Sequence, residues 1–101
     1  MIKHIVMWKL LEFAEGNGKE VNVVKMKDML ENLKTKINEI RTIEVGINLN
    51  TSSSAYDIVL STEFESINDL NVYLSHPEHI KVSDFITKIR ANRVVVDYEI
   101  Y

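Results

Sequence analysis

The sequence predicts an α+β fold of the ferredoxin-like class, with the element order βαββαβ. Segments whose apolar residues alternate at every second position, as in strands, flank segments whose apolar residues recur every three or four positions, as in helices. The chain has 101 residues, of which 46% are hydrophobic, and this suits one globular domain. Since no internal repeat or linker is evident, we expect residues 1–101 to form a single domain. Its four strands should form one antiparallel sheet with helices on one face.

The first expected strand covers residues 2–11. Its centre, residues 5–8, is rich in β-branched and aromatic side chains. Alternation predicts that one face is directed towards the helices, and this face consists of Ile2, His4, Val6 and Trp8. A turn should follow at residues 15–18, because Gly16 and Gly18 tolerate positive φ angles.

A long amphipathic helix is expected over residues 20–40. Six apolar residues recur there at helical spacing and should form the buried stripe: Val23, Met26, Leu30, Leu33, Ile37 and Ile40. Val21 and Val24 widen this stripe near its start. The charged residues fall mostly on the other faces, which favours a helix that packs on one side only.

Two further strands are expected at residues 42–49 and 55–64, with a polar loop at 50–54 between them. The first of them alternates apolar residues with Glu44, Gly46 and Asn48, which is typical of a half-buried strand.

Two shorter helices and a last strand complete the expected order. Ser66 should cap a helix over residues 67–75, whose inward residues are Ile67, Leu70 and Leu74. Pro77 disfavours the helical conformation of the residue before it, so a separate helix is expected over residues 77–89. The inward residues of this helix are Val82, Phe85, Ile86 and Ile89. The last strand should cover residues 92–101.

The helix-free face of this sheet would be unusually apolar for a monomer. Six of its residues are apolar or aromatic: Ile5, Met7, Val59, Val94, Val96 and Tyr98. Leaving such side chains in water forgoes about 1.5–3 kcal/mol each, and a patch of this size marks an interaction surface. We therefore expect a homodimer in which two copies pack these sheet faces together about a two-fold axis.

Charge and cysteine content exclude several classes of protein. The 12 basic and 15 acidic residues leave a net charge of −3, without the basic excess that nucleic-acid binding requires. The absence of cysteine excludes disulfides, thiolate metal ligands and thiol nucleophiles. No segment is long and apolar enough to span a membrane, and none resembles a signal peptide. We therefore expect a cytoplasmic protein that contacts neither membrane nor nucleic acid.

One histidine pair has a spacing that a metal site can use. His76 and His79 are three residues apart, but Pro77 lies between them and only His4 remains as a third imidazole. Catalytic zinc sites need three protein ligands. We expect neither a metal nor a cofactor.

The whole chain resembles the stress-responsive dimeric α/β-barrel family, called Dabb. Five segments carry the resemblance in the family's order: residues 2–9 (IKHIVMWK), 44–46 (EVG), 56–66 (YDIVLSTEFES), 73–79 (YLSHPEH) and 94–98 (VVVDY). The most specific of them is the tyrosine followed by His-Pro-x-His. The resemblance implies a ferredoxin-like monomer and a dimer whose two sheets form a barrel.

The resemblance also implies candidate catalytic residues. Plant polyketide cyclases of this family close a ring by an aldol-type reaction in a cleft between sheet and helices. The tyrosine and histidine that act in them correspond to Tyr73 and His79, while His4 matches the first-strand histidine and Asp97 the acid near the end. The chain departs from the cyclases at Ile58, where they have a histidine, and in the aliphatic Met26 and Leu30, where they have aromatic residues.

These four residues have a coherent chemical interpretation and a structural one. A histidine can abstract an acidic carbon-bound proton, Asp97 can fix the tautomer of such a histidine, and Tyr73 can donate to an enolate oxygen. Alternatively, His79 pairs with Asp97 or a helix end as a satisfied polar contact, and Tyr73 packs with its hydroxyl at the rim.

Two classes of function therefore remain open. The first is a small homodimeric, stress-associated protein that binds a small apolar ligand in a cleft. The second is a cofactor-independent enzyme, either cyclase-like or monooxygenase-like, that uses His79 and Tyr73. Haem binding is a third alternative, because related barrels degrade haem. In each case we expect the cleft to be lined by Val6, Trp8, Met26, Leu30, Ile58, Leu60 and Phe85.

Overall fold

One four-stranded antiparallel sheet forms the centre of the computed structural model, which describes residues 1–101. Its strands lie in the spatial order β4 (Thr42–Ile47), β5 (Ile58–Phe64), β1 (Ile2–Leu10) and β6 (Arg90–Glu99). The first strand in sequence is thus central, and the last strand lies at an edge beside it. This order confirms the predicted ferredoxin-like fold.

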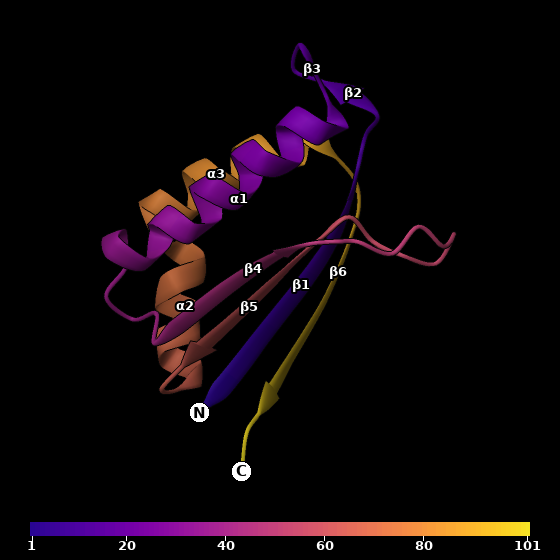
Figure 1. The fold of residues 1–101 in the computed structure, drawn as a ribbon. Helices are drawn as coiled ribbons and strands as arrows, with labels where there is room; N and C mark the ends of the chain where they lie inside the picture. The colour runs from indigo at the N-terminus through magenta and orange to yellow at the C-terminus, as the bar shows by residue number, and fades with distance from the viewer.

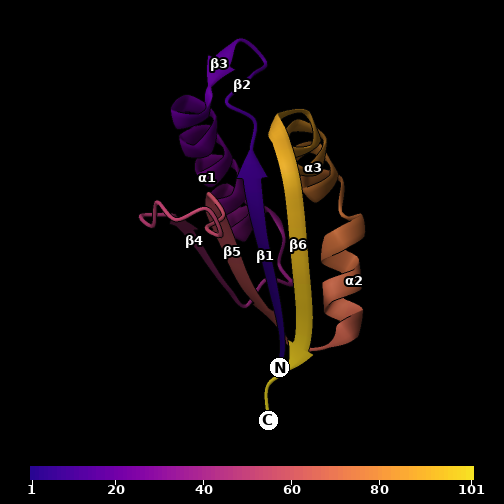
Figure 2. The same ribbon diagram turned by 90° about the vertical axis from the view of Figure 1, so that its right-hand side faces the viewer.

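Three helices cover one face of this sheet (Figure 1). They are α1 (Lys19–Lys36), α2 (Ile67–Ser75) and α3 (Pro77–Ile89). Figure 2 looks onto the opposite face, which no helix covers. A single cluster of buried apolar side chains fills the space between sheet and helices. None of the helices is long and apolar enough to cross a membrane.

Strand β1 alternates as the sequence predicts. Its even-numbered residues, among them Ile2, His4, Val6 and Trp8, are buried beneath the helices, and its odd-numbered residues are half-buried or exposed. The functional candidate on this strand, His4, therefore points into the helix-covered side.

Helix α1 ends four residues before the end that the sequence predicts. Ile37 has an extended backbone and closes the helix through its N–H, which donates to the carbonyl of Leu33. Ile37 and Ile40 are still fully buried, because the turn after the helix directs them into the core. Their apolar spacing continues the helical stripe, although the helix itself does not continue.

The start of α1 also differs from the prediction. Val21 and Val24 are 46% and 50% exposed, so they do not widen the buried stripe. Asn22 is buried instead, and its side-chain amide donates to the carbonyls of Ala14 and Asn17. These carbonyls belong to a small hairpin, β2 (Phe13–Ala14) and β3 (Asn17–Gly18), which surrounds the predicted turn.

Helix α2 is capped as predicted but buries a different residue. The hydroxyl of Ser66 accepts a hydrogen bond from the N–H of Asp69. Leu74 is 37% exposed and Ile67 is 54% exposed, whereas Tyr73 is fully buried. The aromatic ring packs against Phe64, with ring centroids 5.0 Å apart, and this contact decides which face of α2 turns inward.

Strand β6 begins at Arg90, two residues earlier than predicted, and it contains a bulge. Lys9 is paired with Asn92, but the next residue of β1, Leu10, is paired with Arg90, so that Ala91 has no partner. A bulge shifts the alternation of side chains by one residue. Arg90 consequently joins Arg93 on the helix-covered face, although simple alternation puts them on opposite faces.

The helix-free face carries the apolar side chains that the sequence predicts. Met7, Val94, Val96 and Tyr98 are each 38–52% exposed there. Ile5 and Val59 are half-buried beside them. The face is thus an open apolar surface in the isolated chain.

Candidate functional site

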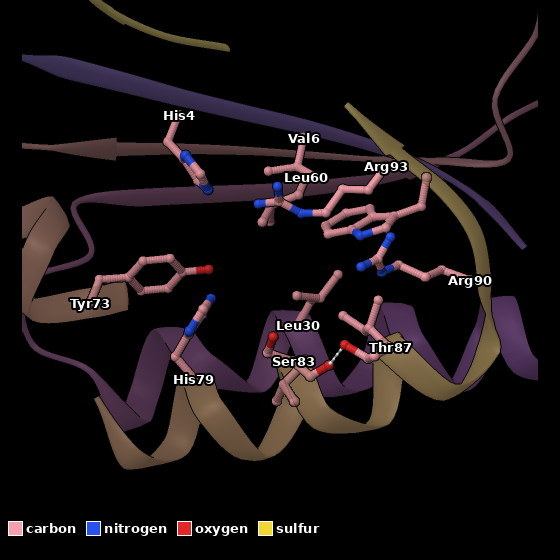
Figure 3. A pocket seen from close by; sticks show the side chains of 13 residues that line it. His4, Val6, Leu30, Leu60, Tyr73, His79, Ser83, Thr87, Arg90 and Arg93 are labelled. Carbon is pink, nitrogen blue, oxygen red and sulfur yellow. Dashed lines mark hydrogen bonds between the residues drawn. The ribbon is translucent and has the colours of Figure 1, made fainter. Parts of the chain in front are cut away.

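A pocket of about 250 Å³ opens between the helix-covered face of the sheet and helices α2 and α3. Side chains from β1, β5, β6 and all three helices line it (Figure 3). Its volume is slightly below the range of about 300–1,000 Å³ that is typical of ligand pockets, so it suits a small molecule.

His4 contributes one imidazole to this pocket, and a hydrogen bond to Asp97 orients the imidazole ring. The two residues are direct partners across the β1–β6 ladder, so their side chains share one face. Nδ1 of His4 lies 2.5 Å from the Asp97 carboxylate. Because a carboxylate accepts, Nδ1 carries the proton of the neutral ring, and Nε2 keeps its lone pair. Figure 3 shows the ring directed into the pocket.

Tyr73 contributes a hydroxyl that has no partner. The side chain is fully buried, and its oxygen makes no hydrogen bond within the protein. Its ring lies between two imidazoles, with centroids 6.1 Å from His4 and 4.5 Å from His79. Burial raises the pKa of the Tyr73 phenol well above its usual range, against a small opposing effect of the Arg93 charge. The hydroxyl therefore stays protonated and is available as a donor.

His79 contributes the second imidazole. Its Nδ1 lies 3.1 Å from the carbonyl of Leu74, at the end of α2. A carbonyl only accepts, so Nδ1 is the donor and Nε2 again keeps its lone pair. Burial lowers the pKa of His79 below its usual 6.5, against the bond to Leu74. The charge of Arg93 and the charges that His4 and His76 carry when protonated lower it further. His79 is therefore a neutral base at neutral pH.

Two arginines complete the pocket on the side of β6. Arg93 is the ladder partner of Trp8, and the bulge at Ala91 brings Arg90 to the same face. Sequence reasoning missed both residues. Arg93 could have been found from the sequence, because it is four residues from Asp97 and alternation along a strand places both on one face. Arg90 could not, because only the bulge brings it to that face.

The structure brings together most of the predicted site residues. His4, Tyr73 and His79 line the pocket directly, and Asp97 supports His4 from the edge strand. Four of the predicted apolar residues also line it: Val6, Trp8, Leu30 and Leu60.

Three predicted lining residues lie elsewhere. Met26 and Ile58 are fully buried within the core, and Phe85 packs beneath the ammonium of Lys25, 5.1 Å from its ring centroid. None of the three lines the pocket. Helix α3 presents its residues at positions 79, 82, 83, 86 and 87 to the cavity, which leaves Phe85 outside it. Val82 and Ile86 were expected to point inward, whereas Ser83 and Thr87 were missed because they are polar and exposed in a helix.

The assembled site favours proton transfer and anion stabilisation. Two imidazoles offer unprotonated nitrogens, the phenol of Tyr73 offers a proton donor, and Arg90 and Arg93 add positive charge. No acidic side chain lines the pocket, and no group of three or more potential metal-ligating side chains occurs in the structure.

Comparison with known proteins identifies close relatives of this architecture. The family model of the stress-responsive A/B barrel domain matches residues 2–100. A stress-response A/B barrel domain-containing protein of Arabidopsis thaliana, DABB1, is 28% identical over 98 residues, which are 97% of this chain. They are 46% of that protein, so the chain spans about half the length of this relative.

Solved structures with the same fold include proteins with and without a stated activity. A dimeric protein of unknown function from Bacteroides fragilis, with a ferredoxin-like fold, is 35% identical and has a TM-score of 0.84, over 98% of this chain and 95% of that one. A hydroxynitrile lyase from Passiflora edulis has a TM-score of 0.82, over 99% of this chain and 93% of that one. Its identity is 15%, so this likeness shows a shared fold alone.

Proposed function

This chain belongs to the stress-responsive A/B barrel domain family, and from that premise we propose that its pocket binds a small, mostly apolar molecule and catalyses proton transfer beside a carbonyl group of that molecule. The proposal combines the two main classes that the sequence leaves open, since a catalytic pocket is also a ligand pocket.

One observation carries the proposal: the hydroxyl of Tyr73 is buried without a partner between two imidazoles. A buried hydroxyl without a hydrogen bond costs about 1–3 kcal/mol, which a ligand that accepts its hydrogen bond would offset. A ligand oxygen in the pocket would accept this bond. The hydroxyl is then a donor prepared for an oxygen that becomes negative during a reaction.

The reaction follows from the roles of the side chains. Nε2 of His79 takes a proton from the carbon beside the carbonyl. The electron pair of the broken C–H bond forms the C=C bond of an enolate, and the π pair of the C=O bond moves onto the oxygen. Tyr73 donates a hydrogen bond to the resulting enolate oxygen. His4, oriented by Asp97, offers a second Nε2 on the other side of the tyrosine ring. Return of a proton from His79 to the carbon regenerates the carbonyl compound.

Exchange of carbon-bound hydrogen for deuterium tests this proposal. We expect the protein to accelerate the exchange of the methylene protons of phenylacetone in D₂O, followed by NMR and corrected for buffer. His79→Gln and Tyr73→Phe should each reduce the acceleration by about 10²-fold, which is typical of a lost general base or oxyanion donor.

His76→Asn is the matched histidine control for this experiment. His76 caps α3 through Nδ1, which accepts from the N–H of Glu78, and it does not line the pocket. Asparagine is also a good N-cap, so this variant should exchange at the parent rate. The proposal fails if the parent gives no acceleration, or if His79→Gln and His76→Asn behave alike.

We also propose that the protein acts as a homodimer through the helix-free sheet face. The exposed apolar side chains of Met7, Val94, Val96 and Tyr98 support this assembly, since burying them against a second copy removes them from water. The relative from Bacteroides fragilis is described as dimeric. The pocket lies on the other side of the sheet, so the dimer leaves it open to ligand.

A further inference from the structure

We propose that the ligand of this pocket is a small carboxylic acid whose carboxylate is bound by Arg90 and Arg93. This inference rests on the proposed function, because it assigns the charged group of the same ligand whose carbonyl meets Tyr73 and His79. It concerns recognition rather than proton transfer, and the two are tested by different measurements.

Two guanidinium groups reach one pocket because of the local structure of β6. Arg93 lies opposite Trp8 on the helix-covered face, and the unpaired Ala91 brings Arg90 onto that face opposite Leu10. Without the bulge, residues three apart on a strand point to opposite faces. The bulge therefore has a direct effect on the pocket, since it doubles the positive charge there.

Neither guanidinium is neutralised within the protein. Arg90 and Arg93 make no ion pair and no side-chain hydrogen bond, whereas the third arginine, Arg41, pairs with Glu65 at 3.1 Å. The pocket contains no acidic side chain among its lining residues, and the carboxylate of Asp97 is engaged by His4. The charges of Arg90 and Arg93 thus remain available to a ligand anion.

The opposite end of the pocket supplies an independent sign of a ligand. The unpartnered hydroxyl of Tyr73 is fully buried, and Figure 3 shows it directed into the cavity beside His79. Apolar side chains of Leu30 and Leu60 lie between this end and Arg90. Figure 3 shows the Arg93 guanidinium directed along the pocket towards His4 and that of Arg90 farther from Tyr73. The complementary molecule has an oxygen beside Tyr73, an apolar body, and an anionic group between the two arginines.

The end of α3 favours a carboxylate over a phosphate. Helix α3 ends at Ile89, and Arg90 is its C-cap residue, so the negative end of the helix dipole lies beside the arginines. A doubly charged phosphate is disfavoured there more than a singly charged carboxylate. The planar guanidinium also matches a carboxylate with two parallel hydrogen bonds.

The single tryptophan of the chain provides the readout. Trp8 lines the pocket and is the ladder partner of Arg93, so its fluorescence should respond when the pocket is filled. The probes are phenylacetate and phenylacetamide, which have nearly the same shape but differ in charge. We expect phenylacetate to bind about tenfold more tightly, as a hydrogen bond to a charged group predicts.

Arginine variants assign this preference to the two residues. Arg93→Gln and Arg90→Gln should each remove most of the roughly tenfold preference for the acid. Arg41→Gln, which changes a solvent-exposed arginine away from the pocket, should keep the full preference. Circular dichroism checks that each variant is folded. If Arg93→Gln loses its structure, Arg93→Lys replaces it in the test; this variant keeps the charge and should retain part of the preference for the acid.

The outcomes separate this inference from the proposed function. Equal binding of acid and amide overturns the carboxylate inference, while deuterium exchange of the neutral ketone leaves proton transfer standing. Tighter binding of phenyl phosphate than of phenylacetate also overturns it. Preference for the acid without any deuterium exchange supports the inference and removes the catalytic proposal. If neither acid nor amide binds, the carboxylate inference fails, and exchange of the ketone alone decides the proton-transfer proposal.

Discussion

The ring of Tyr73 packs against that of His79 with centroids 4.5 Å apart, yet the hydroxyl of Tyr73 makes no hydrogen bond to any protein group. The contact fixes the aromatic ring between the two imidazoles and leaves its polar atom without compensation. The unpaired hydroxyl thus lowers the stability of the fold at the position where it can donate to a ligand oxygen.

Replacement of Tyr73 by phenylalanine should therefore stabilise the fold. The ring and its packing remain, while the buried hydroxyl is removed, so we expect the free energy of unfolding to rise by about 1 kcal/mol. Urea titration at fixed protein concentration measures the change. Tyr56→Phe is the matched control, because the hydroxyl of Tyr56 accepts from Asn92 and its loss should be neutral or slightly destabilising. A clear loss of stability in Tyr73→Phe would contradict the assignment of an unpaired hydroxyl.

The tautomer of His4 should depend on Asp97. In the parent, the carboxylate accepts from Nδ1, so the ¹⁵N shifts of the neutral ring should report a proton on Nδ1. Asp97→Ala removes the acceptor and should increase the form that is protonated on Nε2, whose free nitrogen, Nδ1, lies on the side of position 97 instead of in the pocket. We expect deuterium exchange to slow by about tenfold. Asp84→Ala, an exposed carboxylate on α3, should leave both the tautomer and the exchange rate unchanged.

Periodicity was sufficient to predict the elements and the face on which His4 lies. Alternation along β1 places His4 beneath the helices, and the structure confirms it. It does not identify the ladder partner of a residue, however, so the bond between His4 and Asp97 became visible only through the register of β1 and β6.

Other features depend on packing or on backbone irregularity. The spacing of α2 is equally compatible with Tyr73 or Leu74 pointing inward, and the contact of Tyr73 with Phe64 selects the tyrosine. The bulge at Ala91 places Arg90 on the face opposite to the one that alternation predicts. No residue type in this part of the sequence indicates that a bulge is present. The anionic selectivity of the pocket therefore had no counterpart in the sequence prediction.

Protonation of His79 should lower stability as the pH falls. Burial lowers its pKa below the 6.5 of the unfolded chain, so the unfolded state binds more protons in the interval between the two values. The contribution of the neutral ring is present above 6.5 and is lost as the pH decreases towards the folded-state pKa. Urea titrations at about pH 5 and pH 7.5 should show a smaller decrease for His79→Gln than for the parent.

His76→Asn is again the appropriate control for this pH dependence, since His76 caps α3 outside the pocket. We expect its pH profile to follow that of the parent closely, because the His76 charge is the smallest of the effects on the His79 pKa. Parallel profiles for the parent and His79→Gln would show that other groups cause the loss of stability. The deuterium-exchange rate should also begin to fall only below pH 6.5, because the lowered pKa keeps the His79 ring neutral until the pH falls below 6.5.

The proposed dimer should depend on Val96, which lies on the apolar sheet face. Val96 is 52% exposed in the isolated chain, and a two-fold interface contains it twice. Val96→Glu would bury two unpaired carboxylates, so we expect the dimer dissociation constant to rise by at least about tenfold. Sedimentation equilibrium measures it. Val24→Glu makes the same substitution at a 50% exposed valine on α1 and should leave the dimer intact. A parent that is monomeric at micromolar concentration, or equal weakening by both variants, would exclude this sheet face as the interface.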